Sequence, residues 1–298
     1  MQGNIKNING LVLLLFCLTG FFAIAQSESH IPLPENQEEG YPRLYITQDG
    51  KKALQKTIKK EAWAQEVLAG IHKRIDAYVE RHVDDPEWIV SRLQMYWKTK
   101  STNIYVNGIN YSHADGEAPV PTVRFVGSRD YTTPYGKPKL EDVLPYMDDP
   151  RGLYLPNRSK EGNPFEWVEI SKTGRIIYSI NEEIIGLARD AAFVYWLEKG
   201  CNSGQTYDFL IYDIFHTYME GMSYRSEPID LLNGHIQTLV GFTNFQVIHE
   251  GVLRDNAELY DFLHSYIEAK HNDDIEMYDN TIKRWTDQII KNGVPQNN

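Results

Sequence analysis

Apolar residues recur at intervals of three and four in two parts of the chain, which is the spacing of amphipathic helices. In the first part, from Thr47 to about His82, this spacing predicts one or two helices, with Thr47 as the N-cap. A shorter helix is predicted from Pro86 to Trp97, with proline at its first position.

The helical pattern returns after Thr173 and predicts a series of further helices joined by links of a few residues. Links this short are typical of antiparallel helical hairpins. Because no strand region of comparable weight is visible, we expect a mainly α fold. The predicted helices cover residues 176–199, 207–222, 229–253, 257–269 and 275–291.

The segment between the two helical parts, residues 99–172, has no sustained period and is rich in Gly, Pro, Asn, Asp and Tyr. A long stretch without secondary structure is uncommon in a compact domain unless it is functional or packed over something else. One interpretation is a surface excursion laid on the helices. The other is one wall of a cleft, in which Arg124, Arg129 and the many tyrosines would be available to a sugar.

The N-terminus has the layout of a secretory signal peptide, with Lys6, an apolar run over residues 10–22 and the small-residue site Ala23-Ile24-Ala25. This predicts a signal peptide at 1–25, a flexible linker at 26–40 and a helical domain at 41–298. The apolar run is short for a membrane span. We therefore expect an exported protein, periplasmic or secreted, that does not insert into the membrane after signal cleavage.

The charge and the cysteines narrow the range of partners and cofactors. The net charge of −11 becomes −12 when Lys6 leaves with the signal peptide, and this acidic balance argues against nucleic acid as a partner. A local basic cleft could still bind an anionic sugar.

After signal cleavage Cys201 is the only cysteine, so no internal disulfide is expected. Without zinc-type Cys/His spacing, we expect no metal and no cofactor.

Several segments, taken in order, resemble secreted bacterial polysaccharide lyases of the heparinase II/III-like and alginate-lyase-like group. The resemblance runs from about residue 41 to the end of the chain and depends on the order of the segments more than on any one of them. The segments are YPRLYIT (41–47), PVPTVRF (119–125), WVEISKTG (167–174), INEEI (180–184), DAAFVYWLEKG (190–200) and LVGFTNFQVIHEGVL (239–253).

The resemblance implies an incomplete (α/α) toroid of helical hairpins that binds an acidic polysaccharide or oligosaccharide. In the family a β-sandwich domain follows the toroid, and residues 41–298 do not include one. The family's catalytic Asn or Asn-His element would begin near the segment NGVPQNN (292–298). On this interpretation the chain is the N-terminal part of a lyase and is inactive alone, because the family's catalytic Tyr and His match no position in this sequence.

The implied reaction is β-elimination at a uronic acid. The proton beside the carboxylate is removed, and the carboxylate charge must be neutralised by a donor such as Asn, Arg or His. Asn298 is the candidate for that role.

Amides on the predicted helices are further candidates for binding the sugar. Gln237 and Asn244 share a face of the 229–253 segment, and Asn181 lies one turn into the 176–199 helix. These amides would either bind substrate or satisfy backbone groups inside the helix stack. The alternative function is a non-catalytic glycan-binding helical protein of the bacterial envelope.

Overall fold

The computed structural model describes part of the chain, and every described residue belongs to one compact unit that begins at Gly40. The predicted signal peptide and nearly all of the predicted linker lie outside the described residues. The described ranges are 40–97, 103–106, 109–112, 119–121, 133–144, 152–169, 172–173, 176–198, 207–224 and 246–293.

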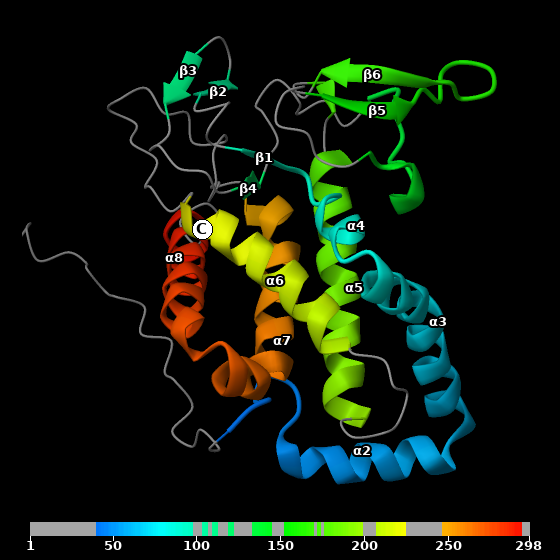
Figure 1. The fold of residues 1–298 in the computed structure, drawn as a ribbon, viewed down its shortest axis with the longest axis vertical. Coiled ribbons are helices and arrows are strands. Elements are labelled where there is room, and N and C mark those ends of the chain that lie inside the picture. Colours follow the sequence, from blue (N-terminus) through cyan, green and yellow to red (C-terminus); the bar gives the residue numbers. More distant parts are fainter. Residues whose placement is uncertain are drawn as a thin grey trace, which may run out of the picture. The chain divides into compact units, whose positions relative to one another are not determined.

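Three long helices form the centre of the core: α5 (Ile176–Glu198), α6 (Tyr207–Tyr224) and α7 (Gln246–Lys270). Figure 1 shows α5 and α7 side by side with α6 packed against both. Helix α5 is apolar on nearly all sides, so it is buried by its neighbours rather than lying on the surface. Its fully buried residues include Ile180, Ile184, Ile185, Ala188, Ala191 and Ala192.

Helix α8 (Ile275–Gly293) follows the short 3₁₀ helix η5 (Asn272–Asp274) and packs on α6 and α7. Its Tyr278 and Trp285 side chains are almost wholly buried. The predicted helices at 176–199, 207–222 and 275–291 are thus confirmed to within a few residues. The mainly α class is confirmed as well.

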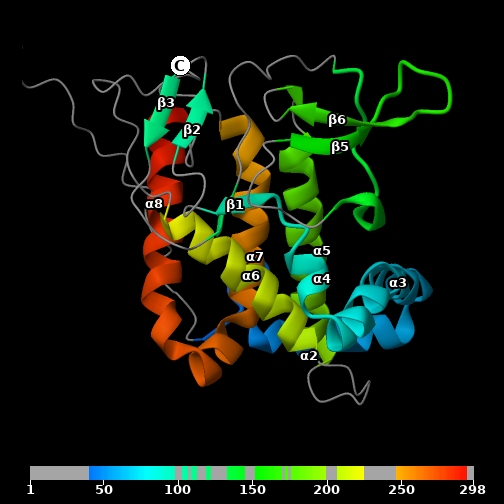
Figure 2. The same ribbon diagram turned by 45° about the horizontal axis from the view of Figure 1, so that its top comes forward.

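The first helical part contains two helices, α2 (Gln48–Lys60) and α3 (Ala62–Asp84), as the spacing allowed. Thr47 occupies the N-cap position of α2, but its side chain makes no capping hydrogen bond. Helix α2 lies across the C-terminal end of α5 (Figures 1 and 2). There, Lys51 Nζ donates to the Trp196 carbonyl and Gln55 Nε2 donates to the Leu197 carbonyl, which satisfies two carbonyls that the helix end leaves free.

The helix predicted at Pro86–Trp97 is wrong in its extent. Helix α4 covers only Glu87–Val90, with Pro86 at the N-cap, and residues Met95–Trp97 form strand β1. Leu93 and Met95 are almost fully buried beyond the helix end. An extended chain buries these apolar positions in the core without continuing the helix.

The segment predicted to lack regular structure contains, in its described parts, two antiparallel two-stranded sheets and one strand of a third. Strand β4 (Pro119–Pro121) pairs with β1, and β2 (Asn103–Val106) pairs with β3 (Ile109–Ser112). Strand β5 (Gly152–Pro156) pairs with β6 (Phe165–Glu169). A 3₁₀ turn, η2 (Leu140–Asp142), buries Leu140.

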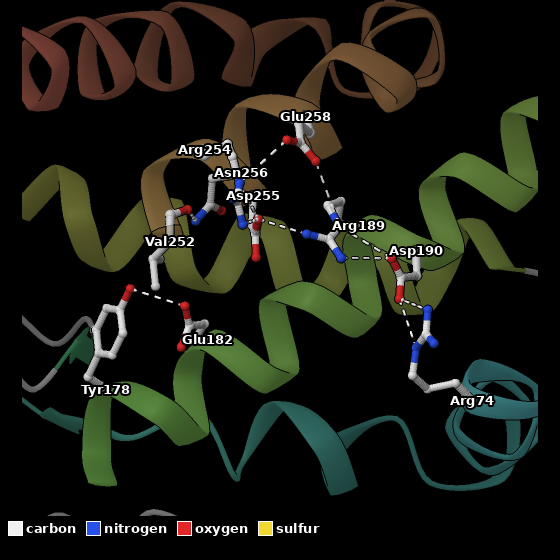
Figure 3. A network of polar contacts seen from close by, with 10 residues as sticks. All are labelled: Arg74, Tyr178, Glu182, Arg189, Asp190, Val252, Arg254, Asp255, Asn256 and Glu258. Carbon is white, nitrogen blue, oxygen red and sulfur yellow. Dashed lines mark hydrogen bonds and ion pairs between the residues drawn. The ribbon is translucent and has the colours of Figure 1, made fainter. Parts of the chain in front are cut away.

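The predicted break between helices at 253–257 is also wrong, because α7 continues through it. The polar run Arg254–Asn256 suggested a link, but Asp255 points to α5 and accepts a hydrogen bond from Arg189 Nη1 at 2.8 Å (Figure 3). Asn256 donates to the Val252 carbonyl within the helix. The charges are therefore compensated across the α5–α7 interface. Residues 229–245 lie outside the described part.

The segment that leads into α2 is fastened to α7 by one carboxylate. Asp261 accepts hydrogen bonds from the backbone N–H groups of Arg43 and Leu44, each at 3.0 Å. The Tyr41 ring stacks on His264, with centroids 3.6 Å apart and planes 7° apart. This contact fixes the entry of the chain on the side of α7.

Candidate functional site

The β5–β6 hairpin presents two chemically different faces, as an antiparallel pair does when one face is buried. Leu155 and Val168 point into the core, with exposed fractions of 0% and 2%. Tyr154, Phe165 and Trp167 point outward, and their exposed fractions lie between 43% and 48%. We call these three side chains the aromatic face.

Two residues of the aromatic face form a cross-strand pair. Tyr154 lies directly opposite Trp167 in the strand register, and the ring centroids are 5.1 Å apart at an interplanar angle of 65°. Edge-on pairs of this kind hold both rings in defined positions. Aromatic residues left exposed together on a rigid element indicate a binding surface more often than isolated exposed residues do.

The loop that joins the two strands is held by Asn157, which is itself buried. Its side-chain oxygen accepts hydrogen bonds from the Ser159 backbone N–H at 3.0 Å and from the Ser159 hydroxyl at 2.6 Å. Its amide nitrogen donates to Glu166 at 3.1 Å. Gly162 and Asn163 close the turn with positive φ angles of 75° and 48°. The hairpin is therefore a rigid support rather than a loose loop.

Arg158 follows the aromatic face along the chain and is exposed. Its backbone N–H donates to the Pro134 carbonyl, and its side chain lies across Gly136. A Cβ at position 136 would come within 2.3 Å of Arg158 Nε, so only glycine allows this path of the side chain. Within the described part of the chain, no carboxylate pairs with the Arg158 guanidinium, which leaves a cation available beside the aromatic face.

Two further charges of the hairpin pair with each other. Lys160 Nζ forms an ion pair with Glu166, and hydrogen bonds from Lys160 and then from Asn157 lower the pKa of the Glu166 carboxyl. The same contact with Glu166 raises the pKa of the Lys160 amine. Both groups are therefore charged at neutral pH and offset each other, which leaves the exposed side chains of Arg158 and Glu161 as the charges of this loop with no ion pair among the described residues.

Most of the site residues predicted from the sequence lie outside the described residues: Arg124, Arg129, Gln237, Asn244 and Asn298. Asn181 is described, and it is 2% exposed within α5. Its side-chain oxygen accepts from the Gln94 backbone N–H at 2.6 Å, and its amide nitrogen donates to the Gln94 carbonyl at 3.3 Å. This is the arrangement expected of an amide that satisfies buried backbone groups. The aromatic face does not include it.

Sequence reasoning did not single out the aromatic face, although a signal for it was present. Outward aromatic positions at 154, 165 and 167 alternate with inward positions that are apolar except for Glu166, and the two stretches flank the turn-rich residues 157–164. This combination is typical of a hairpin. The 99–172 segment as a whole has no period, and the two short alternations were hidden within it.

A second polar cluster lies between α6 and the start of α8. Tyr212 donates to Asp274 at 2.8 Å, and the Tyr278 hydroxyl lies 2.7 Å from His216 Nδ1. Burial, followed by the hydrogen bond to Asp274, raises the pKa of Tyr212 above its ordinary value. Burial also raises the pKa of Tyr278. These phenols stay protonated and act as donors, so they do not have the lowered pKa that a phenolate base requires.

The same direction holds for other tyrosines. Burial raises the pKa of Tyr41, Tyr195 and Tyr266, burial and Glu141 raise that of Tyr78 to about 12, and burial with a carboxylate partner raises those of Tyr207 and Tyr260. Each phenol with a shifted pKa in the described region is thus harder to ionise than free tyrosine. These phenols are therefore poor candidates for a base.

The described residues contain neither a metal cluster nor a membrane-spanning helix. No group of three or more His, Cys, Asp and Glu side chains in the described ranges is placed to hold a metal ion. No helix in that part of the chain is both long enough and apolar enough to cross a bilayer.

Comparison of the chain with family models, with curated proteins and with solved structures gave no match in any of the three.

Proposed function

We propose that this chain is the N-terminal part of a lyase that cleaves uronic-acid-containing polysaccharide by β-elimination, and that its described part contributes sugar binding. The observation that carries the proposal is the aromatic face with Arg158 beside it. Aromatic rings offer apolar surfaces to the C–H side of a pyranose ring, and a guanidinium forms charge-assisted hydrogen bonds with a carboxylate. A uronic acid has both features.

The proposal includes the incomplete (α/α) toroid for residues 41–298, with the sugar chain lying against the aromatic face of the β5–β6 hairpin. The packing of α5 with α6 and α7 supplies helical neighbours of the kind that such a fold requires. The groups that move protons in the reaction would come from polypeptide other than the described tyrosines, because burial makes those phenols poor bases.

A second function, non-catalytic binding of acidic glycan in the bacterial envelope, is supported by the same surface. Exposed aromatic rings and a guanidinium can hold a sugar ring and its carboxylate without breaking a bond, which favours this candidate for the described part taken alone. The two functions share the ligand and differ in whether a bond is broken.

Binding is tested by affinity electrophoresis or calorimetry with alginate, heparin, chondroitin sulfate and ulvan, and with a neutral glucan. We expect binding to at least one uronate polymer and no binding to the glucan. Tyr154→Ala and Trp167→Ala should each weaken binding by about 2- to 10-fold, which corresponds to about 0.5–1.5 kcal/mol of aromatic contact. Phe209→Ala is the matched control, because Phe209 is 54% exposed on α6, away from the hairpin in sequence.

Cleavage is tested on the same polymers by the ultraviolet absorbance of the unsaturated product. We expect binding without product from this chain alone. Uronate binding that is equally strong in the double variant Tyr154→Ala/Trp167→Ala and in Phe209→Ala would refute the role of the aromatic face. Product formed by the chain alone would refute the claim that its described part is limited to binding.

A further inference from the structure

Helix α2 concentrates positive charge in a strongly acidic protein. Its thirteen residues contain five lysines and one aspartate, a net charge of +4, so the remaining 285 residues carry −15 of the total of −11. Acidic residues near it in sequence are Asp49 in the first turn, Glu61 at the C-cap and Glu66 in α3. Even with these neighbours, the helix is a local basic surface.

The lysines are directed away from the protein. Lys52, Lys56, Lys59 and Lys60 are all exposed and recur at the spacing that places residues on one side of a helix. Leu54 and Ile58 occupy the opposite side and are half-buried. Lys51 is the exception, because its ammonium group is directed to the Trp196 carbonyl at the end of α5.

Large apolar side chains are exposed immediately before and after this helix. Leu44 and Tyr45 precede α2, with exposed fractions of 53% and 74%, and Trp63 and Val67 at the start of α3 are exposed by 61% and 57%. No residue of α2 is buried, so the helix lies on the surface along its whole length. We call the four exposed lysines and these four apolar side chains the lysine face.

We propose that the lysine face binds the surface of an anionic lipid bilayer, with α2 lying in the plane of the headgroups. Lysines attract acidic headgroups, and their long aliphatic stems let the charge stay in water while neighbouring apolar atoms approach the acyl boundary. Tryptophan and tyrosine favour the same interfacial layer. The inference is independent of the proposed function, since it uses different residues and a different ligand.

The composition of the lysine face favours a bilayer over an acidic polysaccharide. A polyanionic sugar chain would form ion pairs with the lysines, but its hydroxyl-rich surface would offer no apolar contact to Leu44 and Val67. A headgroup layer provides both an anionic potential and an apolar boundary. The charge complementarity is local, because the rest of the chain would be repelled by the same surface. Such repulsion would orient the molecule with α2 toward the bilayer.

The test is co-sedimentation of the whole chain with vesicles of phosphatidylcholine and phosphatidylglycerol in equal parts, and with vesicles of phosphatidylcholine alone. We expect binding to the mixed vesicles only, and weaker binding at higher salt. The double variant Lys56→Glu/Lys60→Glu should bind at least about 20-fold more weakly. The control Lys270→Glu/Lys283→Glu changes the net charge equally at exposed positions outside α2 and should bind as the unaltered chain does.

The apolar part of the lysine face has its own test. Trp63→Ala should weaken vesicle binding about tenfold or more, whereas Trp167→Ala, at an exposed tryptophan on β6, should not. Equal effects of the two lysine double variants, or equal binding to both vesicle types, would overturn the inference. So would a lysine face that binds alginate or heparin but no vesicle, because the partner would then be an acidic polysaccharide.

Discussion

The network of ion pairs between α5 and α7 allows a test of how much a buried ion pair contributes to the free energy of unfolding. Asp255 is 5% exposed at its side chain and lies between Arg189 on α5 and Arg254 on its own helix (Figure 3). Arg189 also contacts Asp190 at 2.9 Å and, more distantly, Glu258 at 3.8 Å. Replacing Asp255 by alanine would remove the most buried acid of this network and leave Arg189 partly compensated.

The expected cost follows from the exposure of each partner. Removing one member of a buried ion pair costs about 3–5 kcal/mol, but Arg189 is 27% exposed and keeps other carboxylates, so we expect about 2–3 kcal/mol for Asp255→Ala. For a chain of this size that is a decrease in Tm of about 3–6 °C. The control is Arg254→Ala, which removes a partner that is 57% exposed and should cost less than about 1 kcal/mol.

Urea denaturation followed by circular dichroism gives the free energy of unfolding of each variant, and a thermal scan gives its Tm. The difference between the two variants is the informative quantity. A loss for Asp255→Ala no greater than that for Arg254→Ala would refute the reasoning, because burial would then not determine the value of these contacts.

Two further predictions concern the N-terminal contact and the hairpin. Burial lowers the pKa of His264, so the stability present above its unfolded pKa of about 6.5 is lost as pH falls through the lower folded pKa. The variant His264→Phe keeps a ring against Tyr41 but cannot take up the proton. Its Tm should therefore decrease less than that of the unaltered chain between about pH 7.5 and pH 5. Gly136→Ala should displace the Arg158 side chain and change the free energy of unfolding by less than about 1 kcal/mol. In calorimetry it should weaken uronate binding as much as Arg158→Ala does, and unchanged binding would contradict the role given to Arg158.

Helices with a strong apolar pattern are predictable from sequence, because the spacing of their apolar residues along the chain already indicates which side of the helix is buried. The span of α5 agrees with the prediction to within one residue, since almost every turn contributes apolar side chains to the core. The continuity of α7 was not predictable in the same way. Arg254, Asp255 and Asn256 look like a polar link until Arg189, 66 residues earlier than Asp255, is known to face them.

The candidate site was less accessible to sequence reasoning. The charge of Arg124 and Arg129 is visible in the sequence, whereas the exposure of Tyr154 and Trp167 depends on which side of β5 and β6 faces the core. That choice is made by Leu155 and Val168 packing inward, which is a tertiary effect. A two-residue period predicts that the faces differ but does not predict which rings stay free.

The bond from Asp261 to the backbone of Arg43 and Leu44 joins positions 217 and 218 apart in the chain. Such a contact has a high loop-closure cost and contributes to a large contact order. While the polypeptide is being synthesised, the contacts of Tyr41, Arg43 and Leu44 with α7 cannot form until α7 has emerged. Docking of this early segment is therefore a late folding event, and polypeptides that stop short of Asp261 should leave it open to proteolysis.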